Sequence, residues 1–368
     1  MLFRTFSFDK CTKWIVFFMI SVLFFAPQAH SVSAQEEALT VRVASIVIDN
    51  EPIKTEYVMK DGHLLVPALF FKHMGTKVDK SDKYQSLVFR YGDIQFALPI
   101  GKKQSYKSVK GTTKWETSTL TTEVLELEGE AFVPLLDVVK NLEMDVTYDS
   151  RMKRTFVTTN SAPAPKAIST GNPNKKLVSL TFDDGPDRHY TPQILDILKE
   201  KGVKATFFVT GEQVKNHPDI MKRIVEEGHS IGNHTWSHPS LDETFTADVI
   251  QEVTSTQQMI EKTVGRASDL FRPPYGAITK SDAIVLHDIG YRVILWSVDT
   301  LDWSGKSKEE IIDIVERDIS PGGIVLQHNF QSTERVLDGT VEALPTIIDH
   351  LRKKGYKFVT VQTLLDNY

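Results

Sequence analysis

Cysteine is almost absent from this sequence: Cys11 is the only one among 368 residues. A single thiol excludes a disulfide framework, a thiolate zinc site and an iron–sulfur cluster, because each of these needs several cysteines. Runs of five or six basic residues are also missing, and the formal net charge is −5. Phosphate binding depends on clustered Lys and Arg, so we predict no nucleic-acid partner.

Long apolar runs are equally scarce, and the most apolar one, Trp14 to Phe25, has only about twelve residues, against about 20 for a membrane-spanning helix. Two lysines precede this run and Val32-Ser-Ala34 follows it, which is the layout of a signal peptide. We therefore predict that residues 1–34 are removed, leaving a secreted or cell-envelope protein with no stable membrane span. An uncleaved membrane anchor and a buried helix are the alternatives.

The length favours two domains, since a domain usually has about 100–200 residues. Residues 161–174 are rich in Pro, Ser, Ala and Gly and have little to bury, so they are predicted to be a linker. The linker divides the rest into a first region, 36–160, and a second region, 175–368.

The first region contains a degenerate repeat, Leu64–Asp79 and Ala131–Val146. Each copy has an apolar strand, a proline suited to the first helical turn, and an amphipathic helix. This pattern resembles the copper amine oxidase N-terminal-like (stalk) domain, a small α+β domain, although the second copy has Glu143 where glycine is usual. We predict a binding or positioning role and no metal site, because His63 and His73 have no convergent partners.

The second region alternates strands and helices, which predicts parallel strand pairing in an α/β fold. The expected strands are Leu177–Phe182, Ala205–Thr210, His229–Gly232, Leu270–Phe271, Arg292–Val298, Gly323–Gln327 and Lys357–Val361. The expected helices are Pro192–Glu200, Asp219–Glu227, Ala247–Thr263, Ser281–Asp288, Lys308–Asp318 and Val341–Lys353. Reactive residues follow the strands one after another, and a barrel would gather them at one mouth. This convergence favours a (β/α) barrel over an open doubly wound sheet.

His234 and His238 are four residues apart, a spacing that lets both imidazoles reach one ion. The adjacent carboxylates of Asp183 and Asp184 follow another strand and have no use in core packing. Two histidines and one carboxylate leave a metal position open for water, which is the arrangement of a catalytic site. The second carboxylate is then available as a base.

Five segments in order resemble the motifs of polysaccharide deacetylases, which are carbohydrate esterase family 4, also called the NodB homology domain. They are Thr181-Phe-Asp-Asp-Gly-Pro186, His234-Thr-Trp-Ser-His238, Arg272-Pro-Pro-Tyr275, Asp299-Thr-Leu-Asp-Trp303 and Leu326-Gln-His328. The resemblance implies a distorted (β/α) barrel that removes N-acetyl groups from amino sugars with a divalent metal. Zinc fits best, with cobalt, nickel or manganese as alternatives.

The resemblance also implies a role for each motif residue. Asp184, His234 and His238 would hold the metal, Asp183 would be the general base, and His328 the general acid. In supporting roles, Arg272 would orient Asp183, Asp299 would pair with His328, and the backbone N–H of Tyr275 would stabilise the oxyanion. The side chains expected to contact the sugar are Tyr275, Trp303 and Leu326.

The sequence therefore predicts a metal-dependent N-deacetylase acting on N-acetylglucosamine in peptidoglycan or chitin-like oligomers. N-acetylmuramic acid remains open as the target sugar. Two further hypotheses remain: an O-acetyl xylan or glycan esterase, and a carbohydrate-binding envelope module with little or no catalysis. The presence of both Asp183 and His328 speaks against a pure binding module, which has no need of a base or an acid.

Overall fold

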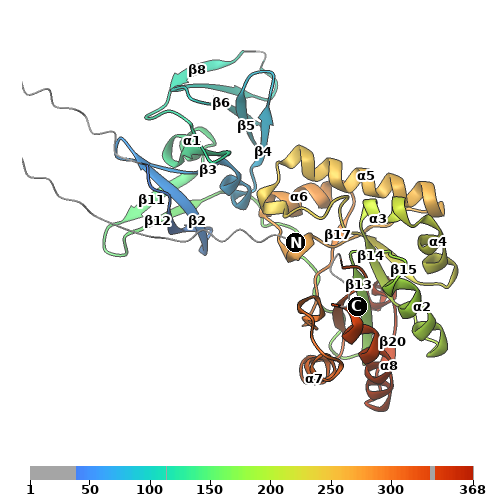
Figure 1. The fold of residues 1–368 in the computed structure, drawn as a ribbon. Helices are drawn as coiled ribbons and strands as arrows, with labels where there is room; N and C mark the ends of the chain where they lie inside the picture. The colour runs from blue at the N-terminus through green and yellow to red at the C-terminus, as the bar shows by residue number, and fades with distance from the viewer. Residues whose placement is uncertain (1–38, 113, 332–335, 368) are drawn as a thin grey trace, which may run out of the picture. The chain divides into compact units, whose positions relative to one another are not determined.

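The computed structural model describes residues 39–112, 114–331 and 336–367 (Figure 1). The predicted signal peptide, with Cys11, lies outside the described residues. Residues 39–368 form one compact unit. Within the described part of the chain, no helix is both long enough and apolar enough to span a bilayer.

The first half of this unit is built mainly of β-strands in two sheets. The first sheet has the order β11-β12-β1-β2-β3-β10-β9, and the second has the order β4-β5-β6-β7-β8. The strands are β1 (Arg42–Ile48), β2 (Glu51–Lys60), β3 (His63–Pro67), β4 (Lys77–Ser81), β5 (Ser86–Tyr91), β6 (Ile94–Pro99), β7 (Gln104–Val109), β8 (Glu116–Thr119), β9 (Leu125–Leu127), β10 (Glu130–Pro134), β11 (Asp145–Asp149) and β12 (Arg154–Thr158).

The two copies of the predicted repeat pair with each other in the first sheet, next to its edge strand β9. Strands β3 and β10 run antiparallel, with Val66 opposite Val133, and each strand leads through a proline into a short helix. The second copy forms the α-helix α1 (Leu135–Asn141), as expected. The first copy forms a 3₁₀-helix instead, η1 (Ala68–Met74), which ends where the N–H of Gly75 donates to the carbonyl of Lys72 three residues earlier.

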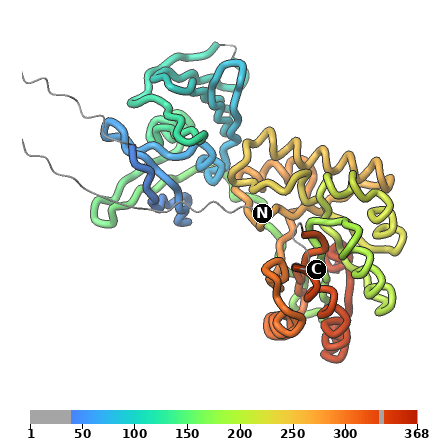
Figure 2. Tube along the Cα trace, in the orientation of Figure 1, coloured from blue at the N-terminus to red at the C-terminus, as the bar shows by residue number. Residues whose placement is uncertain are grey.

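The second half consists of short parallel strands covered by helices, and Figure 2 follows the chain through it from yellow-green to red. The strands are β13 (Leu177–Asp183), β14 (Thr206–Val209), β15 (Ser230–Asn233), β16 (Leu270–Phe271), β17 (Arg292–Val293), β18 (Val298–Asp299), β19 (Gly323–His328) and β20 (Lys357–Phe358). The α-helices are α2 (Tyr190–Glu200), α3 (Gly211–Asn216), α4 (Pro218–Glu226), α5 (Thr246–Val264), α6 (Lys280–Asp288), α7 (Lys308–Asp318), α8 (Asp338–Lys353) and α9 (Val361–Asp366). The 3₁₀-helices here are η2 (Leu241–Glu243), η3 (Pro274–Gly276) and η4 (Asp302–Ser304).

The parallel strands form one sheet of order β17-β16-β15-β14-β13-β19-β18, to which β20 adds beside β13. This half-barrel confirms the α/β fold predicted from the sequence. Helices α2, α4, α7 and α8 lie outside the strands (Figure 1). The carboxyl ends of all these strands therefore point to one side of the sheet, as the barrel prediction requires.

The predicted strand Arg292–Val298 is divided into β17 and β18, which lie at opposite ends of the strand order. The reason is the fully buried Arg272, whose guanidinium donates to the carbonyls of Ile294 and Leu295 at 3.3 and 3.1 Å. These carbonyls are therefore taken out of any strand ladder. The chain crosses here from one edge of the sheet to the other.

The last part of the predicted linker belongs to this sheet. Ile168 forms a parallel bridge with Ile294, and Thr170 forms an antiparallel bridge with Gly323. Residues 167–171, which we call the bridging segment, thus contact a strand near each end of the half-barrel. They fill part of the gap that the sheet leaves open.

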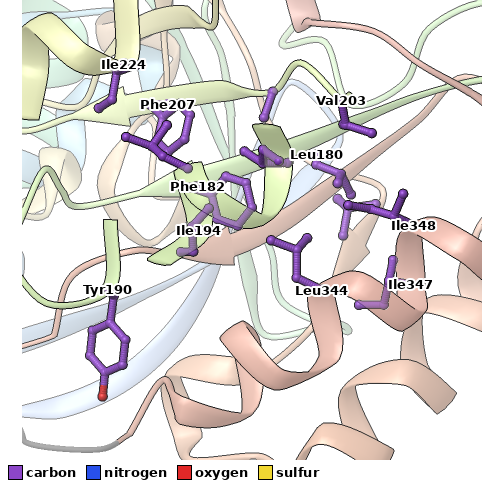
Figure 3. Close-up of a cluster of buried hydrophobic side chains, with 14 of the residues drawn as sticks. Leu180, Phe182, Tyr190, Ile194, Val203, Phe207, Ile224, Leu344, Ile347 and Ile348 are labelled. Atoms are coloured by element: carbon purple, nitrogen blue, oxygen red, sulfur yellow. The ribbon is translucent and has the colours of Figure 1, made fainter. Parts of the chain in front are cut away.

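The largest apolar core lies between the central strands and the helices that cover them. Leu180 and Phe182 of β13 face Leu344 and Ile348 of α8, and Phe207 of β14 stacks on Phe182 with ring centroids 5.3 Å apart (Figure 3). Burying such side chains stabilises a fold by about 1.5–3 kcal/mol each. This rigid packing fixes the strand ends that carry the polar motifs.

Candidate active site

Residues from all five motifs line one pocket of about 570 Å³ at the carboxyl ends of the strands. Asp183 ends β13, His234 follows β15, and His328 ends β19. Thus segments separated by more than 140 residues meet in one place, as the order of the motifs predicted. Among the described residues, this pocket also contains the one cluster suited to a metal ion.

That cluster consists of Asp184, His234 and His238. The Nε2 atoms of the two histidines lie 3.3 and 3.2 Å from Oδ1 of Asp184. The Nδ1 of His234 lies 2.7 Å from the carbonyl oxygen of Arg272. A carbonyl only accepts, so Nδ1 carries the hydrogen and Nε2 of a neutral His234 ring presents a lone pair.

The Oδ1 atom of Asp184 is buried and has no hydrogen-bond partner in the described part of the chain. Lone pairs of a carboxylate and of a neutral imidazole repel at 3.3 Å unless a cation lies near them. The donor set, two imidazoles and one carboxylate, is also that of catalytic zinc sites. The three side chains therefore fit a divalent cation.

Asp183 is buried beside the cluster and is held by an arginine. Nη1 of Arg272 lies 2.7 Å from Oδ1 of Asp183 and also donates to Thr181, and the guanidinium packs 4.1 Å from the ring centroid of Phe208. Burial lowers the pKa of Arg272, and the carboxylate of Asp183 opposes that change. The other oxygen of Asp183, Oδ2, lies 3.9 Å from Nε2 of His234, so it faces the metal-ligand cluster.

His328 has a different partner from the predicted one. Its Nδ1 lies 2.7 Å from Oδ1 of Asp302, which is fully buried, whereas Asp299 accepts from the backbone N–H of Leu301. The predicted pairing of Asp299 with His328 is therefore wrong. Asp302 is fixed by further hydrogen bonds from Thr340 and from the backbone of His328.

This pairing changes the charge of the imidazole. Burial lowers the pKa of His328, but the charge and hydrogen bond of Asp302 raise it more, with help from Asp184 and Asp183, to about 9. His328 is consequently a protonated imidazolium at neutral pH, with Nδ1–H directed at Asp302.

Several non-glycine residues around the pocket adopt the left-handed backbone conformation. The φ angles are 78° at Asp184, 66° at Thr235, 64° at His238, 58° at Tyr275 and 55° at Leu301. Each such residue costs of order 1–3 kcal/mol, and this cost tends to concentrate at functional sites. This backbone conformation turns the chain sharply after a strand, so that side chains from several short loops reach the same pocket.

The rim of the pocket is aromatic. Tyr275 and Trp303 are 70% and 49% exposed, and Leu326 lines the wall, so all three predicted sugar-contacting residues border the pocket. The sequence analysis missed Trp236 and Trp296, which also line it. Trp236 lies inside a motif and could have been found; Trp296 was assigned to a continuous strand.

A third residue that was not predicted is Glu252 of α5. Its Oε2 accepts from the backbone N–H groups of Trp236 and Ser237, each at 2.8 Å, and its Oε1 accepts from the Ser237 hydroxyl. Glu252 therefore fixes the loop between the two histidines, although it lies fourteen residues after His238 and belongs to no motif.

Comparison with known proteins agrees with this geometry. Residues 170–294 match the polysaccharide deacetylase model, and residues 47–157 match the copper amine oxidase N-terminal domain model. The peptidoglycan-N-acetylglucosamine deacetylase PgdA of Listeria monocytogenes is 30% identical over 364 residues, or 97% of this chain and 74% of PgdA.

The chain belongs to the polysaccharide deacetylase family. Within this family, a Bacillus cereus peptidoglycan-N-acetylglucosamine deacetylase is 42% identical over 195 residues, which are 53% of this chain and 70% of the relative. The N-acetylmuramic acid deacetylase PdaA of Bacillus subtilis is 39% identical over 204 residues, 54% of this chain and 75% of PdaA.

Solved structures of polysaccharide deacetylases show the same fold. One peptidoglycan N-acetylglucosamine deacetylase has a TM-score of 0.53 at 40% identity, covering 55% of this chain and 94% of its own. A family 4 pseudoenzyme from Bacillus anthracis has a TM-score of 0.52 at 32% identity, covering 63% and 80%. The family thus includes both an enzyme and a pseudoenzyme of similar structure, so activity must be argued from the site itself.

Proposed function

We propose that this protein is a metal-dependent peptidoglycan deacetylase that hydrolyses the N-acetyl group of N-acetylglucosamine and releases acetate. The observation that carries this proposal is the meeting of three units in one pocket. A buried Asp183–Arg272 pair, a metal-ligand cluster and a charged His328–Asp302 pair supply a base, an electrophile site and an acid.

Asp183 is the general base in this proposal. Arg272 occupies Oδ1, so Oδ2 takes the proton from water as the water oxygen attacks the acetyl carbonyl carbon. Because the guanidinium is itself fixed by strand carbonyls, it also sets the direction in which Asp183 points.

His328 is the general acid. After the attack, the C–N bond breaks only if the sugar nitrogen receives a proton, since an amide anion is a very poor leaving group. The imidazolium donates this proton from Nε2 while Asp302 holds Nδ1–H. The immediate products are acetic acid and the amine, with one proton on Asp183 and a neutral His328. Acetic acid then gives its proton to the amine, and return of the proton from Asp183 to His328 restores both side chains. The net products are acetate and the ammonium form of the amino sugar, so atoms and charge balance.

Asp184, His234 and His238 would hold the divalent cation, with zinc the first expectation and cobalt, nickel or manganese able to use the same donors. When bound, such a cation acts as a Lewis acid toward the acetyl carbonyl and lowers the pKa of water at the site. The hydrogen bond from His234 Nδ1 to the Arg272 carbonyl oxygen orients the imidazole ring so that Nε2 faces the cation position.

The choice of peptidoglycan rests on the relatives and on the predicted export signal. Tyr275 and Trp303 at the rim offer apolar faces on which a sugar ring can pack. Mass spectrometry of the secreted fraction tests the export proposal: the mature chain should begin at Gln35, and an intact N-terminus would contradict it.

The decisive experiment is acetate release by the full chain from peptidoglycan and from N-acetylglucosamine oligomers, with and without a chelator. Asp183→Asn should lower kcat by at least about 100-fold, while bound metal stays at the wild-type level. Peptidoglycan carrying acetyl groups only on muramic acid separates the two sugars, and acetylated xylan tests the esterase alternative.

A wild-type protein that binds metal but releases no acetate from any of these polymers would contradict the proposal. It would then be grouped with the pseudoenzyme. Asp183→Asn with unchanged turnover would disprove the base assignment alone.

A further inference from the structure

Lys72, in the 3₁₀-helix η1 of the N-terminal half, is fully buried against the deacetylase half. Its Nζ lies 2.8 Å from Oδ1 of Asp282, donates to the carbonyl of Thr244 at 2.6 Å and donates also to the carbonyl of Leu241. The ammonium is thus held by two carbonyl hydrogen bonds and one ion pair, and all three partners belong to the second half of the chain.

Two of these acceptors belong to the segment that follows a metal-ligand residue. The helix η2 (Leu241–Glu243) begins three residues after His238, and both carbonyls that face Lys72 lie at its ends. The Leu241 side chain is fully buried in a separate apolar cluster with Phe271 and Leu286. Lys72 therefore fixes the exit of the loop that carries His238.

The third acceptor belongs to the helix that follows Tyr275. Oδ2 of Asp282 accepts from the N–H and the hydroxyl of Thr279 in a capping box at the start of α6, while Oδ1 faces Lys72. One carboxylate thus joins the start of α6 to the ammonium. Tyr275 lies in the loop from Arg272 to Thr279, which leads into the start of α6.

A separate contact reaches the helix that carries Glu252. The N-cap position of α5, Phe245, has no side-chain cap of its own. Instead, Asp79 of β4 accepts from the N–H of Ala247 at 2.7 Å, and Thr246 accepts from the N–H of Val78 at 3.0 Å. A carboxylate at a helix N-terminus stabilises the helix by accepting from its free N–H groups.

The buried position of Lys72 has an energetic cost that apolar packing would avoid. Replacing a buried ion pair by apolar residues is often neutral or stabilising, whereas removing one partner is strongly destabilising because it leaves an unpaired buried charge. A buried charge pair that joins three segments is therefore better explained by the geometry that it fixes than by net stability.

We propose that Lys72 is a positioning residue of the active site: it joins the segment after His238 to the helix after Tyr275, so the N-terminal domain holds the two loops in place. A role in catalysis for Lys72 rests on the proposed function, whereas the test measures zinc binding and does not depend on catalysis. It predicts that damage to this contact weakens metal binding at Asp184, His234 and His238.

The experiment measures zinc affinity of the full chain by competition with a chelator, and amide hydrogen exchange of residues 239–245. Lys72→Met should weaken zinc binding by about tenfold or more, as for other residues that orient ligands, and should speed exchange in that segment. The matched control is Leu98→Ala, which removes a fully buried side chain of the same domain on β6. It should lower the melting temperature and leave zinc affinity and loop exchange unchanged.

The double variant Lys72→Met/Asp282→Asn guards against misfolding, because it leaves no unpaired buried charge and asparagine can still accept the cap from Thr279. The double variant should fold, and its zinc affinity should be lower than that of the wild type, because the Leu241 and Thr244 carbonyls have lost the Lys72 donor. Wild-type zinc affinity and exchange in either folded variant would overturn the inference. A wild-type protein without acetate release would refute the proposed function alone, because zinc affinity is measured independently.

Discussion

The imidazole of His328 lies against the carboxylate of Asp302, and this contact predicts the alkaline limit of activity. The acid form is present below about pH 9, where Asp302 keeps the ring protonated. Asp302→Asn should move the alkaline fall of kcat/KM to lower pH by one unit or more, because burial remains while the main opposing charge is lost. The part of the His328 pKa rise that is due to Asp302 persists when a bound cation offsets the charge of Asp184.

The control is Asp299→Asn in the same loop. Its carboxylate accepts from the N–H of Leu301 and not from His328, so the alkaline limb should stay at the wild-type pH. An unchanged limb in Asp302→Asn would contradict the acid assignment. The raised pKa also means that this pair stabilises the fold fully below pH 6.5 and loses its contribution as the pH rises through about 9.

His229 predicts a pH dependence of the opposite sign. Burial, with a smaller effect of Lys204, lowers its pKa to about 4, while Nδ1 accepts from the N–H of Ala205. Between pH 6.5 and 4 the unfolded chain binds the additional proton, so the free energy of unfolding should fall by about 3 kcal/mol as the pH drops through this range.

Denaturant titrations at pH 7 and pH 4.5 measure this loss. His229→Gln keeps an acceptor for Ala205 and has no proton to bind, so its stability should depend less on pH. His189→Gln, at an exposed histidine, should keep the wild-type slope. If His229→Gln kept that slope as well, His229 would not be the group that titrates.

At the scale of elements, the two repeat copies differ at the residue that ends the helix. Gly75 has φ 82° after η1, and Glu143 has φ 59° after α1. Glycine adopts this conformation without a Cβ clash, whereas other residues pay about 1 kcal/mol or more. Glu143→Gly should therefore raise the free energy of unfolding by about 0.5–1 kcal/mol, and Gly75→Ala should lower it by a similar amount.

Urea titrations of both variants give the comparison directly, since a Cβ at Gly75 would make only ordinary contacts, 3.5 Å from Ile284. Among the described residues, Glu143→Gly loses an ion pair with Lys107 in which the Glu143 side chain is 68% exposed, and such a pair contributes little. Changes of the same sign in the two variants would refute the assignment of strain to φ.

Local signals in the sequence located most elements of the second region, and a long-range contact explains the division of one predicted strand. Helix α7 was predicted at its observed bounds from its helical periodicity, and the structure adds a capping box of Ser307 and Glu310 at its start. The strand after Arg292 was predicted as continuous, since nothing local shows that Arg272 binds the carbonyls of Ile294 and Leu295.

The same distinction holds within the site. The metal-ligand cluster could be predicted because His234 and His238 have a recognisable spacing and Asp184 follows an apolar strand. The partner of His328 could not be chosen from spacing, because Asp299 and Asp302 lie in one loop. Leu301, with φ 55°, turns that loop and decides which carboxylate enters the core.

For the whole molecule, a cation bound at the cluster should stabilise the fold, because the unfolded chain does not hold the three ligands together. With zinc at about 100 times its dissociation constant, the free energy of unfolding should rise by about 2.7 kcal/mol. Thermal melts with zinc and with excess chelator measure the difference. Asp184→Asn should reduce this zinc-dependent shift, and a full shift in that variant would place the cation elsewhere.

The bridging segment, residues 167–171, has a consequence for how such proteins exchange domains in evolution. Although it lies before the first parallel strand, its backbone pairs with Ile294 and Gly323 of the deacetylase fold. A recombination event that joined a foreign N-terminal domain at residue 174 would replace these five residues and leave their partners unpaired. Successful junctions should therefore fall between Asn160 and Lys166, which makes the bridging segment part of the inherited catalytic module.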